Sequence, residues 1–308
     1  IITNQKTDKA SSNTVTIETN DKNDKVEVTL KDVNIDTSSR KKAAVSVTGE
    51  GDTNIKLDGD NALKSDTYRS GIYGSGSLTI SGGENDSLTA QGGSGANGIS
   101  SSGSLTISGG TVTANGDDGG HGIYSRGGVT ISGGSTVTAN GGSGTISGGS
   151  GIYSVSGDVT ISGGTVTANG GSGKDGHGGY GISSSDVAIS GGTVNANGGD
   201  CKDGYGGNGI SSSNGVAISG GTVKAAGGNG KDGSGGNGIS STSTTISGGT
   251  VTANGGSDNS SGGNGIRSFD VAISGGTVKA AGGNGGYGGS GIIGSGRVAI
   301  SGGTVNAA

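Results

Sequence analysis

A four-residue phrase, Ile-Ser-Gly-Gly, recurs along most of the chain and restricts the possible folds more than any other feature. Its isoleucine returns every 24 to 30 residues, at Ile80, Ile107, Ile131, Ile161, Ile189, Ile218, Ile246, Ile273 and Ile300. A Gly-Ile pair precedes each copy, and Thr-Val-x-Ala follows most copies closely. Such a period is typical of proteins built from stacked structural units. A further copy, at Ile146, lacks both companion phrases, and we interpret it as a loop insertion.

Each unit predicts three short strands, because apolar and polar residues alternate in all three phrases. The predicted inward positions of two successive units are Ile99, Ser101, Leu105, Ile107, Val112 and Ala114, then Ile123, Ser125, Val129, Ile131, Val137 and Ala139. One unit cannot bury its apolar face alone, whereas stacked units can. The sequence therefore predicts an all-β fold, a single-stranded right-handed parallel β-helix (β-solenoid) of about 10–11 coils of roughly 24–30 residues, with three short strands per coil.

Glycine makes up 77 of the 308 residues, which alone would suggest a flexible linker. Collagen is excluded, because glycine does not recur at every third position and proline is absent. The Gly-Gly pair after each Ile-Ser predicts a sharp corner, which positive φ angles allow. Longer Gly-rich loops, such as Gly170–Tyr180 and Gly282–Gly291, join the third strand to the next unit. We expect real flexibility only in these loops.

Residues 1–70 carry 23 of the 43 charged residues and repeat less regularly. We interpret them as N-terminal coils of the same β-helix, continued by the regular Gly-rich repeats of residues 71–308. Leu30 and Leu57 are predicted to occupy the position of the Ile-Ser-Gly-Gly isoleucine. Because the chain has no methionine and its last strand has no cap, we expect it to be part of a longer protein.

Several classes of function are disfavoured by composition. A net charge of −5 argues against a nucleic-acid partner. The sequence contains no run of about 18 apolar residues, so no membrane span is predicted. Cys201 is the single cysteine and therefore cannot form a disulfide within the chain.

Residues 159–171, Val-Thr-Ile-Ser-Gly-Gly-Thr-Val-Thr-Ala-Asn-Gly-Gly, are followed by a Gly-Ile pair. This run resembles bacterial, clostridial-type cell-surface β-helix proteins described as carbohydrate-binding domain-containing proteins. Lys25–Ile35 and Asn54–Ser65 resemble the entry coils of the same family. The resemblance implies a right-handed β-helix, an extracellular or cell-surface location, polysaccharide binding in some members and calcium sites in others. We expect a monomer or one part of a longer surface chain.

The outward position of the Gly-Ile strand forms a predicted column that contains Tyr73, Tyr124 and Tyr153. A flat aromatic face complements the apolar face of a sugar ring, so these residues are the candidate carbohydrate-binding site. The alternative is a surface ladder in which neighbouring tyrosines pack on one another. Tyr180, Tyr205 and Tyr287 lie in the Gly-rich loops, where they line a second groove or shield the backbone.

Asp175, Asp203 and Asp232 occupy related positions in successive loops, and Gly170–Asp175 matches the start of a calcium-binding nonapeptide. Calcium, which takes oxygen ligands, is therefore the candidate metal. Against this, the loops repeat about every 28 residues rather than every nine. Lysines stand next to all three aspartates, so a solvated ladder of lysine–aspartate pairs is the alternative and the one we favour.

Rows of outward threonines suggest ice binding as a further hypothesis. Lys224 and Lys279 interrupt these rows, which argues against it. His121 and His177 lie in separate loops, and no catalytic triad is apparent. The sequence thus favours a non-catalytic surface or secreted protein that binds polysaccharide or mediates adhesion, with enzymatic activity left open. The alternatives are a structural stalk or spacer and, third, a polysaccharide lyase or hydrolase.

Overall fold

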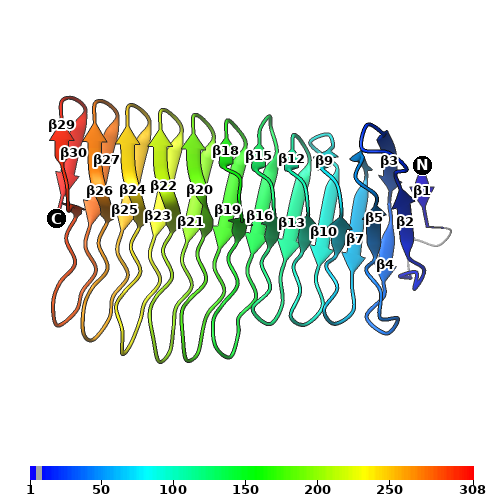
Figure 1. Cartoon of the computed structure of the whole chain (residues 1–308), viewed down its shortest axis with the longest axis horizontal. Coiled ribbons are helices and arrows are strands. Elements are labelled where there is room, and N and C mark those ends of the chain that lie inside the picture. Colours follow the sequence, from blue (N-terminus) through cyan, green and yellow to red (C-terminus); the bar gives the residue numbers. More distant parts are fainter. Residues whose placement is uncertain (5–8) are drawn as a thin grey trace.

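A computed structural model, which describes residues 1–4 and 9–308, shows a straight rod of stacked coils (Figure 1). The described residues form 30 β-strands and no helix, and every strand pairing is parallel. The strands form two sheets that run along the rod, one of 19 strands and one of 11. The all-β parallel β-helix predicted from the repeat is therefore confirmed.

The larger sheet collects the first and second strands of every coil. Its members are β1 (Ile2–Thr3), β2 (Val15–Glu18), β3 (Lys25–Lys31), β5 (Val45–Thr48), β6 (Asp52–Asp58), β8 (Ile72–Gly74), β9 (Leu78–Ser81), β11 (Ile99–Ser101), β12 (Leu105–Ile107), β14 (Ile123–Ser125), β15 (Val129–Ile131), β17 (Ile152–Ser154), β18 (Val159–Ile161), β20 (Ile182–Ile189), β22 (Ile210–Ile218), β24 (Ile239–Ile246), β26 (Ile266–Ile273), β28 (Ile292–Gly294) and β29 (Val298–Ile300). In β20, β22, β24 and β26 the first and second strands are fused into one.

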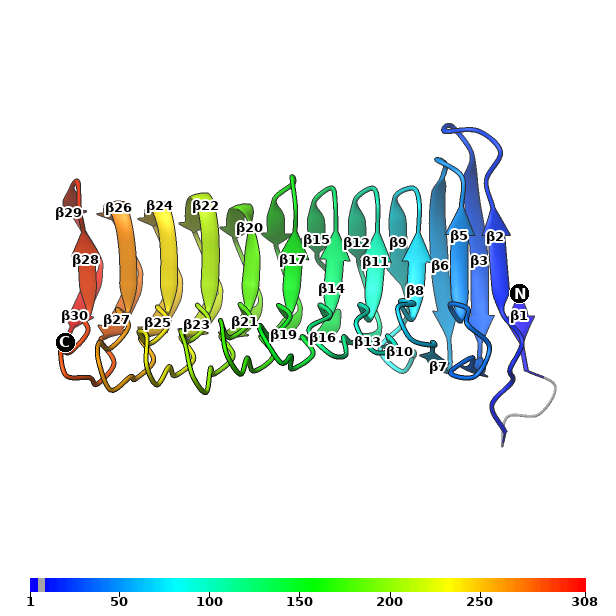
Figure 2. The same ribbon diagram turned by 60° about the horizontal axis from the view of Figure 1, so that its bottom comes forward.

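The smaller sheet collects the third strands, one from each coil. They are β4 (Asn34–Asp36), β7 (Asp60–Lys64), β10 (Ser87–Gln91), β13 (Thr111–Asn115), β16 (Thr136–Asn140), β19 (Thr165–Asn169), β21 (Thr193–Asn197), β23 (Thr222–Ala226), β25 (Thr250–Asn254), β27 (Thr277–Ala281) and β30 (Thr304–Ala307). In Figure 2 the first strands run upward nearest the viewer, and the third strands return downward behind them. Because the coils advance from right to left, the winding is right-handed.

The interior is a ladder of aliphatic side chains stacked in register. Ile99 pairs with Ile123, and Val112 pairs with Val137 in the opposite sheet. All twelve inward positions predicted for the two units are buried. Full burial stabilises each aliphatic side chain by about 1.5–3 kcal/mol, so the ladder supplies the main hydrophobic stabilisation of the rod.

The alignment of the first coils differs from the sequence prediction at one position. Leu30 pairs with Leu57 as predicted, but Ile80 pairs with Ile55 rather than with Leu57. The seven-residue strand β6 places both Ile55 and Leu57 inward, so Leu57 lies one inward position beyond the level of Ile80. Its side chain fills the corner beside Gly110, where a Cβ atom would be 3.2 Å from Leu57 Cδ1.

Seven of the nine Gly-Gly corners that end an Ile-Ser strand adopt the predicted backbone geometry at their second glycine; Gly82-Gly83 and Gly133-Gly134 do not. The second glycine has a φ angle between 75° and 82° at Gly110, Gly164, Gly192, Gly221, Gly249, Gly276 and Gly303. At this φ a side chain would be strained, so glycine is required for the turn between the second and third strands. Ile146 is 70% exposed in the loop between β16 and β17, which confirms that its Ile-Ser-Gly-Gly is an insertion.

The long Gly-rich loops, which hang below the strands in Figure 1, are bonded to one another. Gly179 N–H donates to Gly171 O within one loop, and Gly199 N–H donates to Gly179 O from the next loop, both at 2.8 Å. The same zigzag continues to Gly289, whose N–H donates to Gly283 O at 2.9 Å. The expectation that these loops are free and flexible is therefore wrong for the loop arms.

Close packing explains why these arms contain glycine. A Cβ atom on Gly178 would overlap the carbonyl oxygen of Gly199, and one on Gly179 would overlap that of Gly149. The arms therefore form a second core, made of backbone alone, which we call the glycine core. It joins the two arms of each loop and links each loop to the loops of the neighbouring coils.

Candidate functional site

The outward column of the first strands is in register as the sequence predicted. Tyr73 and Tyr124 both pair with Ser100, and Tyr124 pairs with Tyr153. The column also contains Thr16 and Ser46 before Tyr73, and Ser183, Ser211, Ser240, Arg267 and Ile293 after Tyr153. Because parallel neighbours are ~4.8 Å apart, the column is a straight track of evenly spaced side chains.

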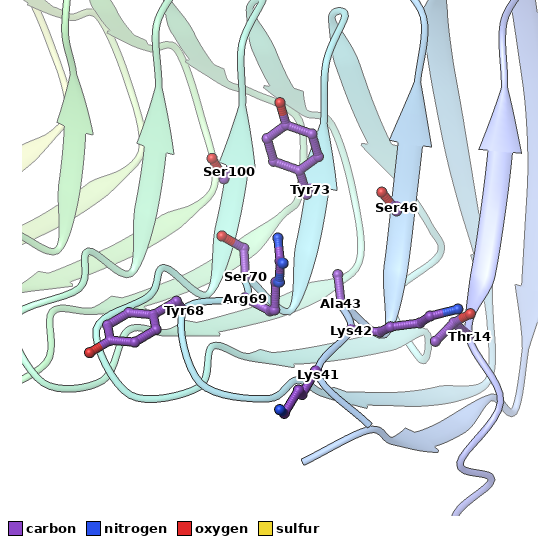
Figure 3. A pocket seen from close by; sticks show the side chains of 10 residues that line it. All are labelled: Thr14, Lys41, Lys42, Ala43, Ser46, Tyr68, Arg69, Ser70, Tyr73 and Ser100. Atoms are coloured by element: carbon purple, nitrogen blue, oxygen red, sulfur yellow. The ribbon is translucent and has the colours of Figure 1, made fainter. Parts of the chain in front are cut away.

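A hollow lies at the N-terminal end of this track (Figure 3). Its volume is about 730 Å³, and we call it the N-terminal hollow. It is lined by Thr14, Lys41, Lys42, Ala43, Ser46, Tyr68, Arg69, Ser70, Tyr73 and Ser100. Tyr73 is 39% exposed there, so its ring is open to a ligand.

Two turns in neighbouring coils form the floor of the N-terminal hollow. Asp66 links them, because its carboxylate accepts the backbone N–H of Lys41 at 2.6 Å and that of Thr67 at 2.7 Å. These two backbone hydrogen bonds hold the pKa of Asp66 below its usual value, and the charge of Lys41 adds to the effect. The two turns are thus fastened together by a carboxylate that stays ionised.

Lys41 and Tyr68 adopt left-handed backbone conformations, with φ angles of 56° and 58°. Such a conformation costs a residue with a Cβ atom roughly 1–2 kcal/mol. Strain of this kind is found most often at functional sites. Two of the four described non-glycine residues with positive φ therefore line the N-terminal hollow, and the other two, Asp32 and Asp118, lie outside it.

The N-terminal hollow is basic although the chain as a whole is acidic. Lys41, Lys42 and Arg69 line it, and no aspartate or glutamate does. Over residues 1–4 and 9–308, none of these three side chains forms a salt bridge or a side-chain hydrogen bond. Two lysines of the same coils are paired, since Lys31 is 2.9 Å from Asp58 and Lys64 is 3.6 Å from Asp36. The hollow therefore brings together three cationic side chains that have no salt-bridge partner among the described residues.

Tyr124 and Tyr153 form a cluster with His121, a residue that the sequence placed in a separate loop. The His121 ring lies 5.8 Å from the Tyr124 ring and 4.8 Å from the Tyr153 ring, and the two tyrosine rings are 5.9 Å apart. His121 and His177 do lie in separate loops, as the sequence indicated, but the packing of His121 on these tyrosines of the first strands was not predicted. This mutual packing favours the surface-ladder alternative for these two tyrosines.

Hydrogen bonds to the two neighbouring loops hold His121 in place. Its backbone N–H donates to Asn97 Oδ1 at 2.8 Å, and its Nδ1 accepts the N–H of Ser150 at 2.9 Å. Burial lowers the pKa of His121 to about 4. The imidazole is therefore neutral near pH 7 and acts as a hydrogen-bond acceptor.

A second, smaller hollow lies further along the same track. Its volume is about 280 Å³, and its side chains include His177, Tyr180, Tyr205, Asn237 and Arg267. His177 and Tyr205 stack with 5.1 Å between ring centroids, so these loop residues line a groove as well as packing on each other. Tyr287 lies outside this groove and is 79% exposed.

The structure places the predicted metal ligands on the loops, beside lysines. Lys174 Nζ is 3.9 Å from Asp175, and Lys231 Nζ is 3.9 Å from Asp203. Among the described residues, no group of three histidine, cysteine, aspartate or glutamate side chains is close enough to hold an ion. Asp232 forms no salt bridge within that same part of the chain. The calcium site at Asp175, Asp203 and Asp232 stays a prediction.

The N-terminal hollow was missed by sequence reasoning, although a signal was present. Arg40, Lys41 and Lys42 form a basic run, and Tyr68 with Arg69 occupies the corresponding turn of the next coil. The run alone resembles a solvated charged turn. Its relation to Tyr73 depends on how the irregular N-terminal coils align, which the repeat does not specify.

Comparison with protein families supports the fold. A family model described as a beta helix repeat matches residues 105–123, 159–186, 187–214 and 245–266. Searches of curated proteins and of solved structures returned no match. The described residues include no helix long and apolar enough to cross a membrane. The chain thus carries β-helix repeats, and its function has to be argued from the site.

Proposed function

We propose that this protein binds polysaccharide without catalysis, at an extracellular or bacterial cell surface, along the track of first-strand side chains. The observation that carries the proposal is Tyr73, an exposed ring at the edge of the N-terminal hollow. An aromatic face there is available to stack on a sugar ring, while the serine and threonine side chains around it offer hydrogen bonds.

The geometry of the rod supports an extended ligand. Coils repeat every ~4.8 Å, so successive coils present side chains at regular intervals along a line that an extended ligand can follow. The two hollows and the His121–Tyr124–Tyr153 cluster lie along the same face, because all three adjoin the outward column. A chain of sugars laid along this face would meet aromatic and polar side chains at several successive coils.

Affinity electrophoresis in gels that contain single polysaccharides tests the proposal. The wild-type protein is expected to be retarded by at least one glycan, and Tyr73→Ala is expected to weaken that binding about tenfold, or ~1.4 kcal/mol. Tyr287→Ala, which removes an exposed tyrosine outside both hollows, is the matched control. Equal mobility in every gel would contradict the proposal.

A structural stalk is the second candidate. The mutual packing of His121, Tyr124 and Tyr153 favours the stalk, because rings that pack on one another stabilise the surface and offer less of their faces to a ligand. A stalk predicts that Tyr124→Ala lowers stability without changing retardation in any gel. A binding track predicts a loss of retardation at a temperature where the variant is fully folded.

A further inference from the structure

We infer that the N-terminal hollow is a subsite for acidic sugar units, which carry a carboxylate or a sulfate group. The inference rests on the proposed function and adds the chemical class of the ligand. It starts from the charge of the hollow, which is lined by Lys41, Lys42 and Arg69 and by no carboxylate.

The arrangement of these side chains suits one sugar unit. Figure 3 shows the Arg69 side chain rising from the floor toward the Tyr73 ring, with Lys42 extending toward Thr14. A sugar stacked on Tyr73 would therefore place its charged substituent beside the guanidinium group. Arginine presents paired N–H donors that match the geometry of a carboxylate or a similar oxyanion.

Asp66 offsets only part of the positive charge, since it attracts Lys41 but forms no salt bridge with any of the three cations among the described residues. Asp66 accepts the backbone N–H groups of Lys41 and Thr67 with its two oxygens, and it is not among the lining residues. It joins the two turns that carry the cations instead of pairing with their side chains. An anionic ligand would supply the partner that these side chains lack in the described part of the chain.

The acidic preference is local to this end of the track. The His121–Tyr124–Tyr153 cluster carries no cation at neutral pH, because the pKa of His121 is lowered to about 4. The smaller hollow contains a single arginine, Arg267, and no lysine. Acidic units are thus expected to bind at the N-terminal coils, and neutral units are tolerated further along.

Two matched pairs of polysaccharides test the inference by affinity electrophoresis: polygalacturonate against its methyl ester, and dextran sulfate against dextran. We expect stronger retardation by an acidic member than by its neutral partner, with at least a tenfold loss in the double variant Lys42→Gln, Arg69→Gln. The first pair reports carboxylate recognition and the second reports sulfate recognition. Lys279→Gln, which removes an exposed lysine on the opposite sheet, is expected to bind like the wild type.

The outcomes separate the inference from the proposed function. Equal retardation within both pairs, with some retardation in the glycan panel, would overturn the acidic preference and leave polysaccharide binding intact. Acidic retardation that is unchanged in the double variant would also overturn the inference, because the attraction would then be non-specific. No retardation by any of the four, or by the wider glycan panel, would contradict both.

Discussion

The imidazole of His121 lies against the ring of Tyr153, with 4.8 Å between their centroids, on the outer face of the rod. Burial in this contact and the hydrogen bond from Ser150 N–H to Nδ1 both require the neutral ring. Protonation of one histidine is thereby coupled to the stability of the aromatic cluster.

The first prediction concerns the pH dependence of stability. The pKa of His121 falls from 6.5 to about 4 on folding, so below pH 6.5 the unfolded chain binds a proton that the native state does not. The free energy of unfolding should therefore be fully retained above pH 6.5 and fall by on the order of 3 kcal/mol as the pH drops to about 4. Urea unfolding at a series of pH values measures this slope.

His121→Asn is the informative variant for this test. Asparagine occupies the same loop position in other coils, where Asn208 Oδ1 accepts the N–H of Asn237. The variant should keep the ladder hydrogen bond and lose this pH dependence. His177→Asn is the control and should keep it, so a slope that survives in His121→Asn would disprove the assignment.

The second prediction concerns the glycine core. Gly179→Ala should lower the free energy of unfolding by about 3 kcal/mol or more, because the new methyl group would overlap a backbone carbonyl that cannot move independently. Gly288→Ala is the matched control, since a Cβ atom there has no neighbour within 4 Å. Similar urea midpoints for the two variants would show that the loop arms are not packed as described.

The third prediction compares two isoleucines with opposite surroundings. Ile182→Ala removes a fully buried side chain of the ladder and should cost about 2–5 kcal/mol. Ile146→Ala removes an exposed side chain from the inserted loop and should change stability by less than about 0.5 kcal/mol. A large effect at Ile146 would mean that the insertion packs against the coils.

The fourth prediction addresses calcium at Asp175, Asp203 and Asp232. Ligand binding to the native state raises the melting temperature, so a bound ion predicts a higher Tm with calcium than with a chelator, and a smaller difference in Asp203→Asn. The lysine–aspartate alternative predicts the same Tm in both conditions and only a small effect of Asp203→Asn, since exposed ion pairs contribute about 0–1 kcal/mol. Differential scanning calorimetry distinguishes the two.

The sequence predicted the aliphatic ladder well because each position in a coil faces one environment. The alternation around Ile99 and Val112 specifies which side chains point inward, and the repeat specifies which residues stack. The outward column with Tyr73, Tyr124 and Tyr153 followed from the same register. Where the repeat weakened, at Leu57, the predicted alignment was wrong by two residues.

Features that depend on loop paths could not be predicted from the repeat. A glycine in a mobile linker and a glycine packed against a carbonyl, such as Gly179, look identical in sequence. His121 contacts Tyr153, and Arg69 lines the same hollow as Tyr73. Both arrangements require the loop to fold back onto the first strand. Their positions follow from hydrogen bonds between neighbouring loops, such as those of Asn97 with His121 and of Asp66 with Lys41, and the repeat does not specify which loop atoms these side chains reach.

The glycine core has a consequence for how stability varies with temperature. Unfolding it exposes peptide groups and almost no apolar surface, and polar exposure lowers the heat capacity change whereas apolar exposure raises it. The heat capacity change per residue should therefore lie below the usual ~12–15 cal/mol/K, which flattens the stability curve. A rod of this composition would lose little stability on cooling, because much of it is held by hydrogen bonds whose strength does not depend on the hydrophobic effect.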